Sequence, residues 1–363
     1  MDKLCTIVGA RPQFIKLAPL SNAIKKHFHE VIIHTGQHYD DNLSKVFFDD
    51  LKIPEPNYNL NVGSLSHAVQ TALMLEKIEE ILIKEKPDLV LVLGDTNSTL
   101  AGAIAASKLN IPLAHVEAGL RSFNREMPEE INRILTDNCS NLLFSPTESG
   151  VNNLKNEGII RNVHNVGDVM YDAIVNNIDI AEIQSTVSRD LGLDNEDYVY
   201  MTVHRPSNTD SSTNLENIIQ AAMAVDFRVI FPLHPRTRVK LINYGLLNQV
   251  DQNSNVTITS PLNYLDSLYL VKNAKLVLTD SGGLQKEAYM LGTPCVTMRE
   301  DTEWIETVDE GWNVLVGSVK EKIINSVNLA KPATSSKNHY GSGDSSKKIV
   351  NIILDYLDKK RAK

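Results

Sequence analysis

Cysteine is scarce in this sequence. Cys5, Cys139 and Cys295 are its only cysteines, and they stand far apart in the chain. An odd number of cysteines without a Cys-x-x-Cys pair argues against a disulfide framework and against a thiolate zinc site. Basic segments are equally rare: the longest is the tail 359–361, and the net charge is −9. We therefore expect no nucleic acid as a partner, and an anionic substrate would need a local cluster of cations.

Long apolar segments are also missing. The longest run, Leu89 to Leu93, is far shorter than the ~20 residues that span a bilayer. The chain enters a strand-like segment at Leu4 without the basic region and the apolar core of a signal peptide. These absences predict a cytoplasmic protein that has no membrane contact.

A third absence concerns cofactors. No Gly-x-Gly-x-x-Gly motif follows a strand-like segment in this chain, and that motif is the fingerprint of dinucleotide binding. Chemistry that passes a hydride through nicotinamide needs such a bound cofactor. We expect no nicotinamide, no flavin and no metal.

Short apolar runs alternate with helix-length amphipathic segments through the 363 residues, of which 42% are hydrophobic and 22% charged. The length favours about two domains of ~150–200 residues. The alternation predicts parallel sheets with helices on both faces. The expected strands are Leu4–Val8, Val31–His34, Leu89–Gly94, Leu113–Glu117, Leu142–Ser145, Val163–Val166, Tyr198–Val203, Arg228–Leu233, Val256–Thr259, Leu276–Thr279 and Pro294–Met298, and the expected helices include Leu17–Lys26, Ala68–Lys84, Leu215–Ala224 and Lys347–Leu357.

The strand–helix pattern restarts after Gly167, where a long helix leads toward Tyr198. We infer an α/β protein of two Rossmann-like, doubly wound domains, residues 1–167 and 168–344, with a seam near residues 167–190. Ligands of such sheets bind beyond the carboxyl ends of the strands. The residues that follow each apolar run are therefore the first place to look for function.

Cations follow the first expected strand, in the segment Gly9–Lys16. Glycine permits a tight turn, and Pro12 suits the first turn of a helix. Arg11 and Lys16 then stand near a helix N-terminus, where anions bind readily. A solvated, charged turn is the plainer interpretation.

Acids follow two other strands of the first half. Asp95 precedes a helix that Asn97 or Ser98 opens, and it could simply cap that helix. Glu117 ends the next strand along the chain and could pair with Arg121. Two acids at neighbouring strand tips are harder to attribute to structure than one.

A further pair of acids opens a helix directly after Pro128. Glu129 and Glu130 fall in its first turn, where acids commonly interact with the helix dipole. That interaction is the plainer interpretation of both.

The second half offers imidazole and guanidinium groups at strand ends. His204 and Arg205 follow one expected strand, and His234 follows another. A lone histidine is more often structural, and we interpret His234 in that way.

Small residues join a later strand to a helix. Ser281, Gly282 and Gly283 free backbone N–H groups at a helix N-terminus, an arrangement that suits a diphosphate. Glu287 lies one turn further along and could accept hydrogen bonds from ribose hydroxyls.

These motifs occur in one order: Gly-Ala-Arg-Pro with Lys16, Leu-Gly-Asp-Thr, His-Val-Glu-Ala-Gly-Leu-Arg, Pro-Glu-Glu-x-Asn-Arg, His-Arg, and Asp-Ser-Gly-Gly-x-Gln with Glu287. Over essentially its whole length the sequence resembles the non-hydrolysing UDP-N-acetylglucosamine 2-epimerases. The resemblance implies two Rossmann-like domains of glycosyltransferase-B type that face a cleft. It also implies a C-terminal helix, residues 345–363, that crosses back onto the first domain, and a homodimer.

The resemblance also implies roles for individual residues. Asp95, Glu117 and Glu129 match the family's catalytic acids, and His204 matches its catalytic histidine. The residues that match contacts of the nucleotide sugar are Arg11, Lys16, Arg205, Ser281, Gly282, Gly283 and Glu287, and those that match an element of an effector site are Gln37 and His38.

Three departures from the family leave details open. Enteric relatives have arginine where this chain has Trp304, and they read Pro-Phe near Leu265–Ser267. The residues after His38, Tyr39–Asp41, also differ. The sugar substituents, the contact to the base and activation by UDP-N-acetylglucosamine therefore stay open.

The implied chemistry is C2 epimerisation of UDP-N-acetylglucosamine to UDP-N-acetylmannosamine for glycan synthesis, through loss and re-addition of UDP. We expect Asp95 and Glu117 to serve as base and acid on the two faces of C2, and Glu129 to hold this arrangement of acids. The sequence does not assign which face each acid serves. The alternatives are a 2,3-diacetamido uronate as the sugar, a UDP-sugar glycosyltransferase, a hydrolysing epimerase, and a non-catalytic nucleotide-sugar-binding protein.

Overall fold

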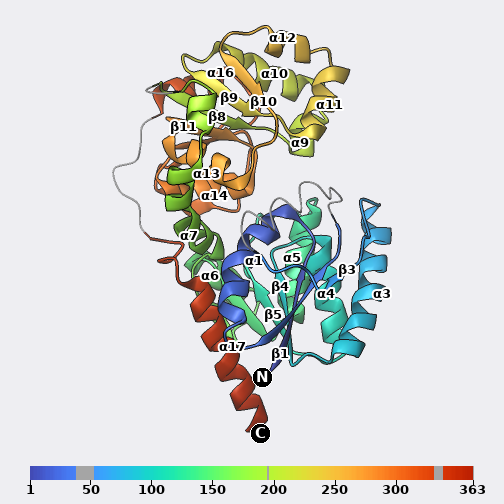
Figure 1. Cartoon of the computed structure of the whole chain (residues 1–363). Coiled ribbons are helices and arrows are strands. Elements are labelled where there is room, and N and C mark those ends of the chain that lie inside the picture. Colours follow the sequence, from blue (N-terminus) through green and yellow to red (C-terminus); the bar gives the residue numbers. More distant parts are fainter. Residues whose placement is uncertain (38–52, 194–195, 331–337, 363) are drawn as a thin grey trace. The chain divides into compact units, whose positions relative to one another are not determined.

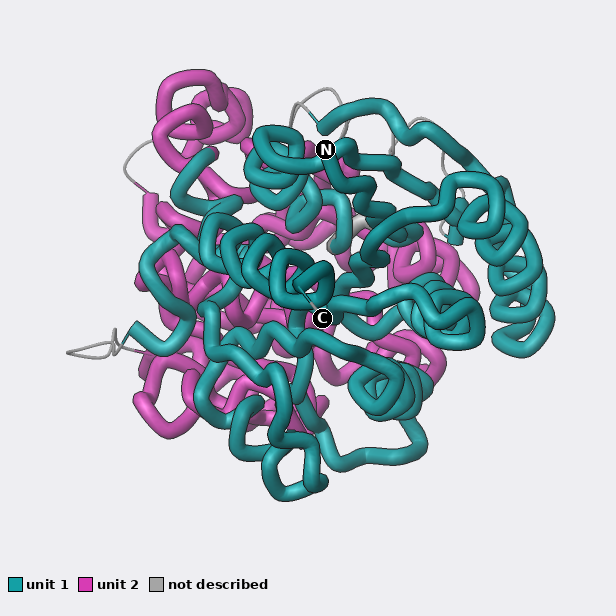
Figure 2. The backbone as a smooth tube through the Cα atoms, turned by 90° about the horizontal axis from the view of Figure 1, so that it is seen from below, with its two compact units in different colours: residues 1–176, 338–363 teal, residues 177–337 magenta. Residues whose placement is uncertain are grey.

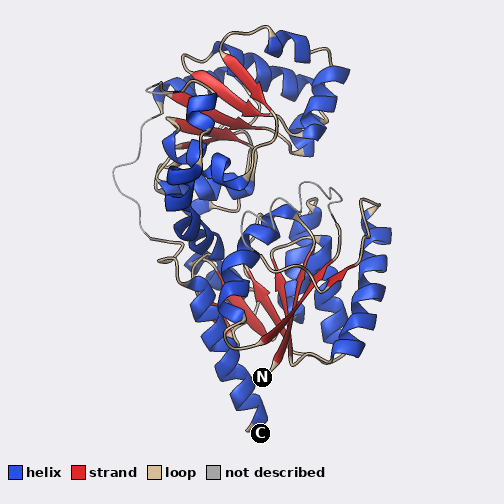
Figure 3. Cartoon of the chain, viewed as in Figure 1, coloured by secondary structure: helices blue, strands red, loops and turns tan. Residues whose placement is uncertain are grey.

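The chain forms two compact units, which Figure 2 shows in different colours. A computed structural model describes residues 1–37, 53–193, 196–330 and 338–362, with only the backbone of Arg11 and Pro12. Unit 1 combines Met1–Asn176 with Asn338–Lys363, and unit 2 is Asn177–Lys337. Each unit contains one parallel sheet packed with helices (Figure 3).

Unit 1 has a seven-stranded sheet in the order β3-β2-β1-β4-β5-β6-β7. The chain leaves β1 toward β2 and later returns to β4 on the other side, so the carboxyl ends of β1, β4 and β5 are neighbours. Ligands bind at such a switch point in doubly wound sheets. The strands are β1 (Lys3–Val8), β2 (His29–His34), β3 (Tyr58–Asn59), β4 (Leu89–Leu93), β5 (Leu113–Val116), β6 (Leu142–Ser145) and β7 (Val163–Asn165).

The helices of unit 1 form two groups (Figure 1). Helix α1 packs with α17, whereas α4 packs with α3 and α5. The helices are α1 (Arg11–Ile24), α3 (His67–Glu85), α4 (Asn97–Lys108), α5 (Pro128–Cys139), α6 (Glu148–Asn156) and α17 (Ser345–Arg361), and α7 (Val169–Gln184) carries the chain into unit 2.

Unit 2 has a six-stranded sheet in the order β10-β9-β8-β11-β12-β13. Here β8 is flanked by β9 and β11, so the residues after these three strands lie at one edge. The strands are β8 (Tyr198–Thr202), β9 (Arg228–Pro232), β10 (Val256–Thr259), β11 (Leu276–Thr279), β12 (Cys295–Thr297) and β13 (Asn313–Leu315), and the helices are α8 (Val187–Asp190), α9 (Pro206–Thr209), α10 (Ser212–Ala224), α11 (Pro235–Asn243), α12 (Leu247–Asp251), α13 (Tyr264–Asn273), α14 (Gly282–Leu291), α15 (Ile305–Asp309) and α16 (Lys320–Leu329).

The central strands are buried on both faces. Every residue of β4 is fully buried, as its uninterrupted Leu-Val-Leu-Val-Leu sequence predicts for a parallel sheet covered by helices. Met74, Ile78 and Leu82 lie along one side of α3 at helical spacing and pack against this sheet. The apolar periodicity of the sequence therefore produces the core of unit 1 directly.

All eleven expected strands are present, with ends that differ by no more than two residues. The apolar runs did not predict β3 and β13, because both are edge strands of only two or three residues. Helix α1 begins at Arg11, so the apolar spacing from Leu17 located only its later part, while Pro12 correctly indicated its start.

The chain crosses between the units twice, and within unit 1 the two crossing segments are joined. The N–H of Asp168 donates to the carbonyl of Tyr340 over 2.9 Å. Gly167 has φ +83°, and a Cβ there would lie 2.8 Å from the same carbonyl oxygen. Only glycine fits this left-handed, closely packed position. None of the helices in the described part of the chain is both long and apolar enough to cross a membrane.

Asp172 of α7 caps the N-terminus of α17. Its buried carboxylate accepts hydrogen bonds from the N–H groups of Ser345 at 3.0 Å and Ser346 at 2.7 Å. Burial raises the pKa of Asp172, and the hydrogen bonds from the two serines oppose that rise. A carboxylate at this position satisfies orphan N–H groups of the first helical turn.

We expect Asp172→Ala to loosen α17, because loss of a cap costs about 1–2 kcal/mol. Hydrogen-exchange mass spectrometry should show the amides of residues 346–357 exchanging roughly 5- to 30-fold faster. Asp179→Ala, at an exposed position of the same α7, is the matched control. Equal protection of α17 in both variants would contradict the capping role.

Candidate active site

The turn after β1 is organised by one buried side chain, Gln13. Its carbonyl accepts from the N–H groups of Gly9 at 2.7 Å and Ala10 at 3.0 Å, and its amide donates to the carbonyl of Leu93 over 2.7 Å. Gln13 therefore ties the end of β1 to the end of β4. The sequence did not predict this role, because Gln13 lies between Arg11 and Lys16 and no local pattern indicates its partners.

Glu117 lies directly after β5 in an unusual backbone conformation, with φ +73°. A non-glycine residue in this region is strained, and such strain is common at functional sites. Its carboxylate forms an ion pair with Lys16 of α1, and both side chains are buried, with exposed fractions of 7% and 9%. Lys16 and Glu117, 101 positions apart in the sequence, are thus brought together.

Gly94 leaves the space that this ion pair occupies. Its φ is +64°, and a Cβ at this position would lie 3.2 Å from the carboxylate of Glu117 and 4.0 Å from the ammonium of Lys16. The alternative that Glu117 pairs with Arg121 is wrong. Arg121 instead pairs with Asp137 at 2.8 Å and Glu157 at 2.7 Å.

Asp95 follows Gly94 and is about one-third exposed. Its carboxylate pairs with the buried guanidinium of Arg133 from α5. Asp95 does not cap α4; Thr96 does, with its hydroxyl accepting from the N–H of Thr99 over 3.3 Å. The capping interpretation is therefore wrong, and the side chain of Asp95 is left for the ion pair.

The two acids of α5 differ. Glu130 is buried and accepts from the N–H of Ser122 at 2.9 Å, the N–H of Phe123 at 3.1 Å and Arg133 at 2.7 Å. It therefore anchors a loop rather than serving only the helix dipole. Glu129 is half-buried, and no hydrogen bond or ion pair joins it to the side chains that the structure describes.

Asp280 organises the strand ends of unit 2. It is fully buried after β11, and it accepts from the N–H groups of His204 at 3.0 Å and Arg205 at 3.0 Å and from the amide of Asn208 at 3.0 Å. A buried carboxylate needs such donors. Asp280 thus fixes the backbone that carries His204 and Arg205, a role the sequence motif did not reveal.

His204 is accessible, with 38% of its side chain exposed, and its Nδ1 lies 3.7 Å from Asp280. The ring of His234 stands beside it, with 5.7 Å between the ring centroids. His234 caps α11, since its Nδ1 accepts from the N–H of Arg236 over 3.2 Å. That contact agrees with the structural interpretation of His234.

The N-terminus of α14 is built from Ser281, Gly282 and Gly283. Ser281 occupies the cap position without a side-chain cap hydrogen bond. A Cβ at Gly282 would lie 2.1 Å from the carboxylate of Glu303, whereas one at Gly283 would meet no atom closer than 3.9 Å. A side chain at position 282 would therefore displace the Glu303 carboxylate, and Gly283 leaves open space where backbone N–H groups could meet an anion.

Trp304 lies beneath this helix N-terminus and is buried. The ammonium of Lys286 lies 4.4 Å from the centroid of its ring, at the distance of a cation–π interaction. Glu303 pairs with Arg299 at 3.0 Å, and Arg205 lies 4.0 Å from it. Glu287 is half-buried in the same helix, and burial together with the charge of Glu287 raises the pKa of Tyr264.

The possible effector residues are only partly described. The side-chain carbonyl of Gln37 accepts from the N–H of Ser98 at 3.1 Å and from its hydroxyl at 2.7 Å. His38 lies outside the described residues, as does the side chain of Arg11. Among the described residues no group of three or more histidine, cysteine, aspartate or glutamate side chains could hold a metal ion.

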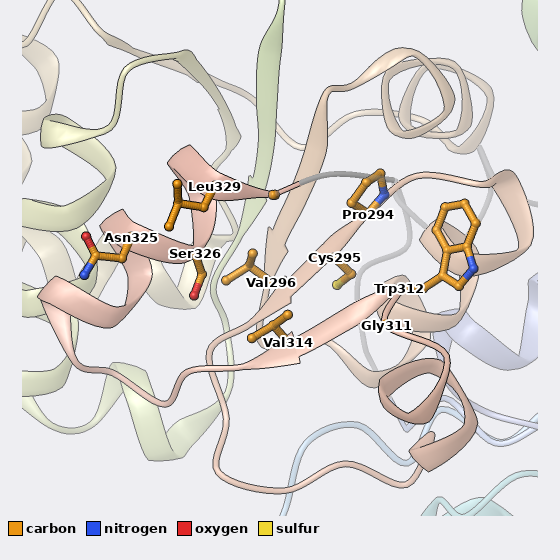
Figure 4. A pocket seen from close by; sticks show the side chains of 10 residues that line it. Pro294, Cys295, Val296, Gly311, Trp312, Val314, Asn325, Ser326 and Leu329 are labelled. Carbon is orange, nitrogen blue, oxygen red and sulfur yellow. The ribbon is translucent and has the colours of Figure 1, made fainter. Parts of the chain in front are cut away.

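A cavity of about 310 Å³ lies between β12, β13 and α16 (Figure 4). Its lining is mainly apolar and includes Val296, Trp312 and Leu329, and it borders the amino end of β12 at Pro294 rather than a carboxyl end. Burial raises the pKa of the Cys295 thiol in its wall to about 12, so this thiol is not a nucleophile near neutral pH. The cavity is separate from the candidate site residues.

The arrangement can perform two kinds of chemistry. In unit 1 two carboxylates at adjacent strand ends, each paired with a cation, can exchange protons with a substrate. In unit 2 an accessible histidine, an arginine and an uncapped helix N-terminus can bind an anion.

Comparisons with known proteins agree on one family. Residues 22–354 match the family model for UDP-N-acetylglucosamine 2-epimerase. A Methanococcus maripaludis protein named as a homolog of that enzyme is 58% identical, over 97% of this chain and 99% of its own. The UDP-2,3-diacetamido-2,3-dideoxy-D-glucuronate 2-epimerase of Pseudomonas aeruginosa is 46% identical, over 97% and 99%.

Solved structures give the same result for the fold. The crystal structure of Methanocaldococcus jannaschii UDP-GlcNAc 2-epimerase in complex with UDP-GlcNAc and UDP is similar with a TM-score of 0.91 and 47% identity. The similarity covers 98% of this chain and 99% of that one.

We expect Asp280→Ala to destabilise unit 2 by roughly 3 kcal/mol, because two backbone N–H groups and Asn208 lose a buried acceptor. Urea unfolding can be followed by tryptophan fluorescence, since both tryptophans, Trp304 and Trp312, belong to unit 2. Asp280→Asn keeps one acceptor oxygen and should lose less. A midpoint unchanged in Asp280→Ala would refute the organising role of this carboxylate.

Proposed function

The chain belongs to the UDP-N-acetylglucosamine 2-epimerase family, and from this premise we propose that it interconverts a UDP-linked N-acetylhexosamine with its C2 epimer. The observation that carries the proposal is the pair of acids at adjacent strand ends. Asp95 and Glu117 flank Gly94, and each is held by its own cation. A protein that only bound a nucleotide sugar would have little use for acids gathered in this way.

The reaction has to overcome an inert C–H bond, because no carbonyl adjoins C2 of the sugar. Departure of UDP, with the electron pair of the C1–O bond, leaves positive character at C1 and acidifies the C2 proton. A carboxylate takes this proton, a C1–C2 double bond forms, and the product is a 2-acetamidoglycal. Re-addition of UDP at C1, with a proton delivered to the other face of C2, gives the epimer.

We assign the proton transfers to Asp95 and Glu117 and the support of their arrangement to Glu129. Departing UDP would be stabilised by the cations and backbone N–H groups, a form of preorganised electrostatic stabilisation. The groups proposed for this task are Arg11, Lys16, His204, Arg205, Ser281, Gly282 and Gly283, and Glu287 is proposed to bind the ribose.

UDP-N-acetylglucosamine and UDP-N-acetylmannosamine are the proposed substrate pair, because the names of several relatives contain UDP-N-acetylglucosamine. A 2,3-diacetamido uronate is the second candidate, and two observations favour it. The Pseudomonas aeruginosa relative acts on that sugar by its name. Trp304 replaces the arginine of enteric relatives with a buried indole, so this position offers no guanidinium to a ligand.

The proposal extends to a homodimer in the cytoplasm whose product enters glycan synthesis. It also includes the domain division at residues 1–167 with 345–363 and 168–344, and the assignment of Gln37 and His38 to an effector site.

The decisive experiment is incubation of the protein with each UDP-sugar in D₂O, followed by NMR. Deuterium should enter C2 of the substrate and of its epimer, because the proton is exchanged at a carboxylate during each turnover. UDP-N-acetylglucosamine and the UDP-diacetamido uronate are tested side by side. Turnover of a sugar without deuterium at C2 would rule out the proposed route.

Asp95→Asn and Glu117→Gln should each lower kcat by about 10²–10⁴-fold, the usual contribution of a proton-transfer group. Glu80→Gln, at an exposed position of α3, is the control with an equal change of charge. The measurement is the initial rate of epimer formation. Either acid variant turning over within ~10-fold of wild type would remove that residue from the mechanism.

A further inference from the structure

Helix α5, which has Glu129 and Glu130 in its first turn, also carries Asn132 and Arg133 one turn further on. The proposed mechanism gives neither a role. Both are buried, with exposed fractions of 6% and 4%, and buried polar side chains need defined partners. Both donate to Asp95, and each also donates to a second side chain.

Arg133 holds the side chain of Asp95. One guanidinium nitrogen pairs with the Asp95 carboxylate, and the other donates to Glu130 over 2.7 Å. Glu130 is itself fixed by the N–H and the hydroxyl of Ser122, both at 2.9 Å. The guanidinium is therefore anchored at one end and presents a fixed donor to Asp95 at the other.

Asn132 holds the main chain of Asp95. Its amide donates to the Asp95 carbonyl over 2.9 Å and to the side chain of Asn97 over 3.2 Å. Asn97 in turn donates to Gln70 of α3 over 2.8 Å, and Gln70 donates to the carbonyl of Gly63 over 2.6 Å. The side-chain amides of Asn97 and Gln70 thus hold the side chain of Asn132 in place.

The turn 93–95 depends on such side chains because the chain leaves the sheet here, at Leu93, the last residue of β4. The carbonyl of Leu93 accepts from Gln13, that of Gly94 accepts from His115 over 2.8 Å, and that of Asp95 accepts from Asn132. Each carbonyl of the turn is therefore bound by a side chain from another element. Asp95 differs from the other two because its side chain is clamped as well.

We propose that Asn132 and Arg133 are positioning residues, which aim the Asp95 carboxylate. The inference rests on the proposed function, in which Asp95 exchanges a proton with C2. Proton transfer needs the carboxylate within hydrogen-bond reach of the substrate proton. A displacement of the carboxylate by about 1 Å can cost ~100-fold in rate. Loss of the Asn132 or Arg133 side chain should therefore lower kcat more than it changes KM.

The test compares Asn132→Ala, Arg133→Gln and Arg133→Lys with two matched controls, Asn138→Ala on the same α5 and Arg161→Gln at an exposed turn of unit 1. Initial rates of epimer formation give kcat and KM. Asn132→Ala and Arg133→Gln should lower kcat by about 10- to 100-fold with KM within roughly 3-fold of wild type. The controls should retain wild-type kcat.

Rescue by a conservative variant separates positioning from a purely structural contribution. In Arg133→Gln the Asp95 carboxylate loses its charged partner, so kcat should fall while KM stays near that of wild type. Arg133→Lys keeps the charge and should retain a larger share of the wild-type kcat than Arg133→Gln. Should Arg133→Gln fail to fold, kcat of Asn132→Ala and of Arg133→Lys still tests the positioning role. Wild-type kcat in Asn132→Ala would then contradict it.

Asp95→Asn, measured in parallel, tells the two possible failures apart. If Asp95→Asn is as active as wild type, the proposed role of Asp95 is wrong and this inference falls with it. If Asp95→Asn is inactive while Asn132→Ala and Arg133→Gln retain wild-type kcat, only the positioning role is overturned.

Discussion

A parallel sheet buried on both faces can place polar chemistry only where its strands end. This constraint governs both units of the molecule. Beyond β1, β4, β5, β8 and β11 the backbone has left the ladder, and its N–H and carbonyl groups need other partners. Gln13 and Asp280 supply those partners in units 1 and 2, respectively. The same turns carry the acids, the histidine and the glycines proposed to meet the substrate.

Much of this could be predicted from the sequence, because apolar periodicity and strand-end motifs are local signals. The buried strand Leu89–Leu93 and the helix that Pro128 opens are examples. What could not be predicted is which charges pair across long sequence separations. Lys16 meets Glu117 and Arg133 meets Asp95, whereas the local candidate partners, Arg121 for Glu117 and the α4 helix for Asp95, were wrong.

The sequence also could not show which side chains support the candidate site residues through hydrogen bonds. Asn132 lies in a recognisable motif, but only folding reveals that its amide reaches the carbonyl of Asp95. The crowding at position 282 is similar: a Cβ there would meet Glu303, 21 positions later in the sequence. Residues that support a site are set by packing, and packing leaves little trace in local sequence.

The C-terminal segment of unit 1 has a consequence for synthesis of the protein. Unit 2 is continuous in sequence, whereas unit 1 needs Asn338–Lys363 to complete it. On the ribosome, α1 therefore waits for α17, its packing partner, until all of unit 2 has been made. Unit 1 can therefore complete its fold only after the whole of unit 2 has been translated.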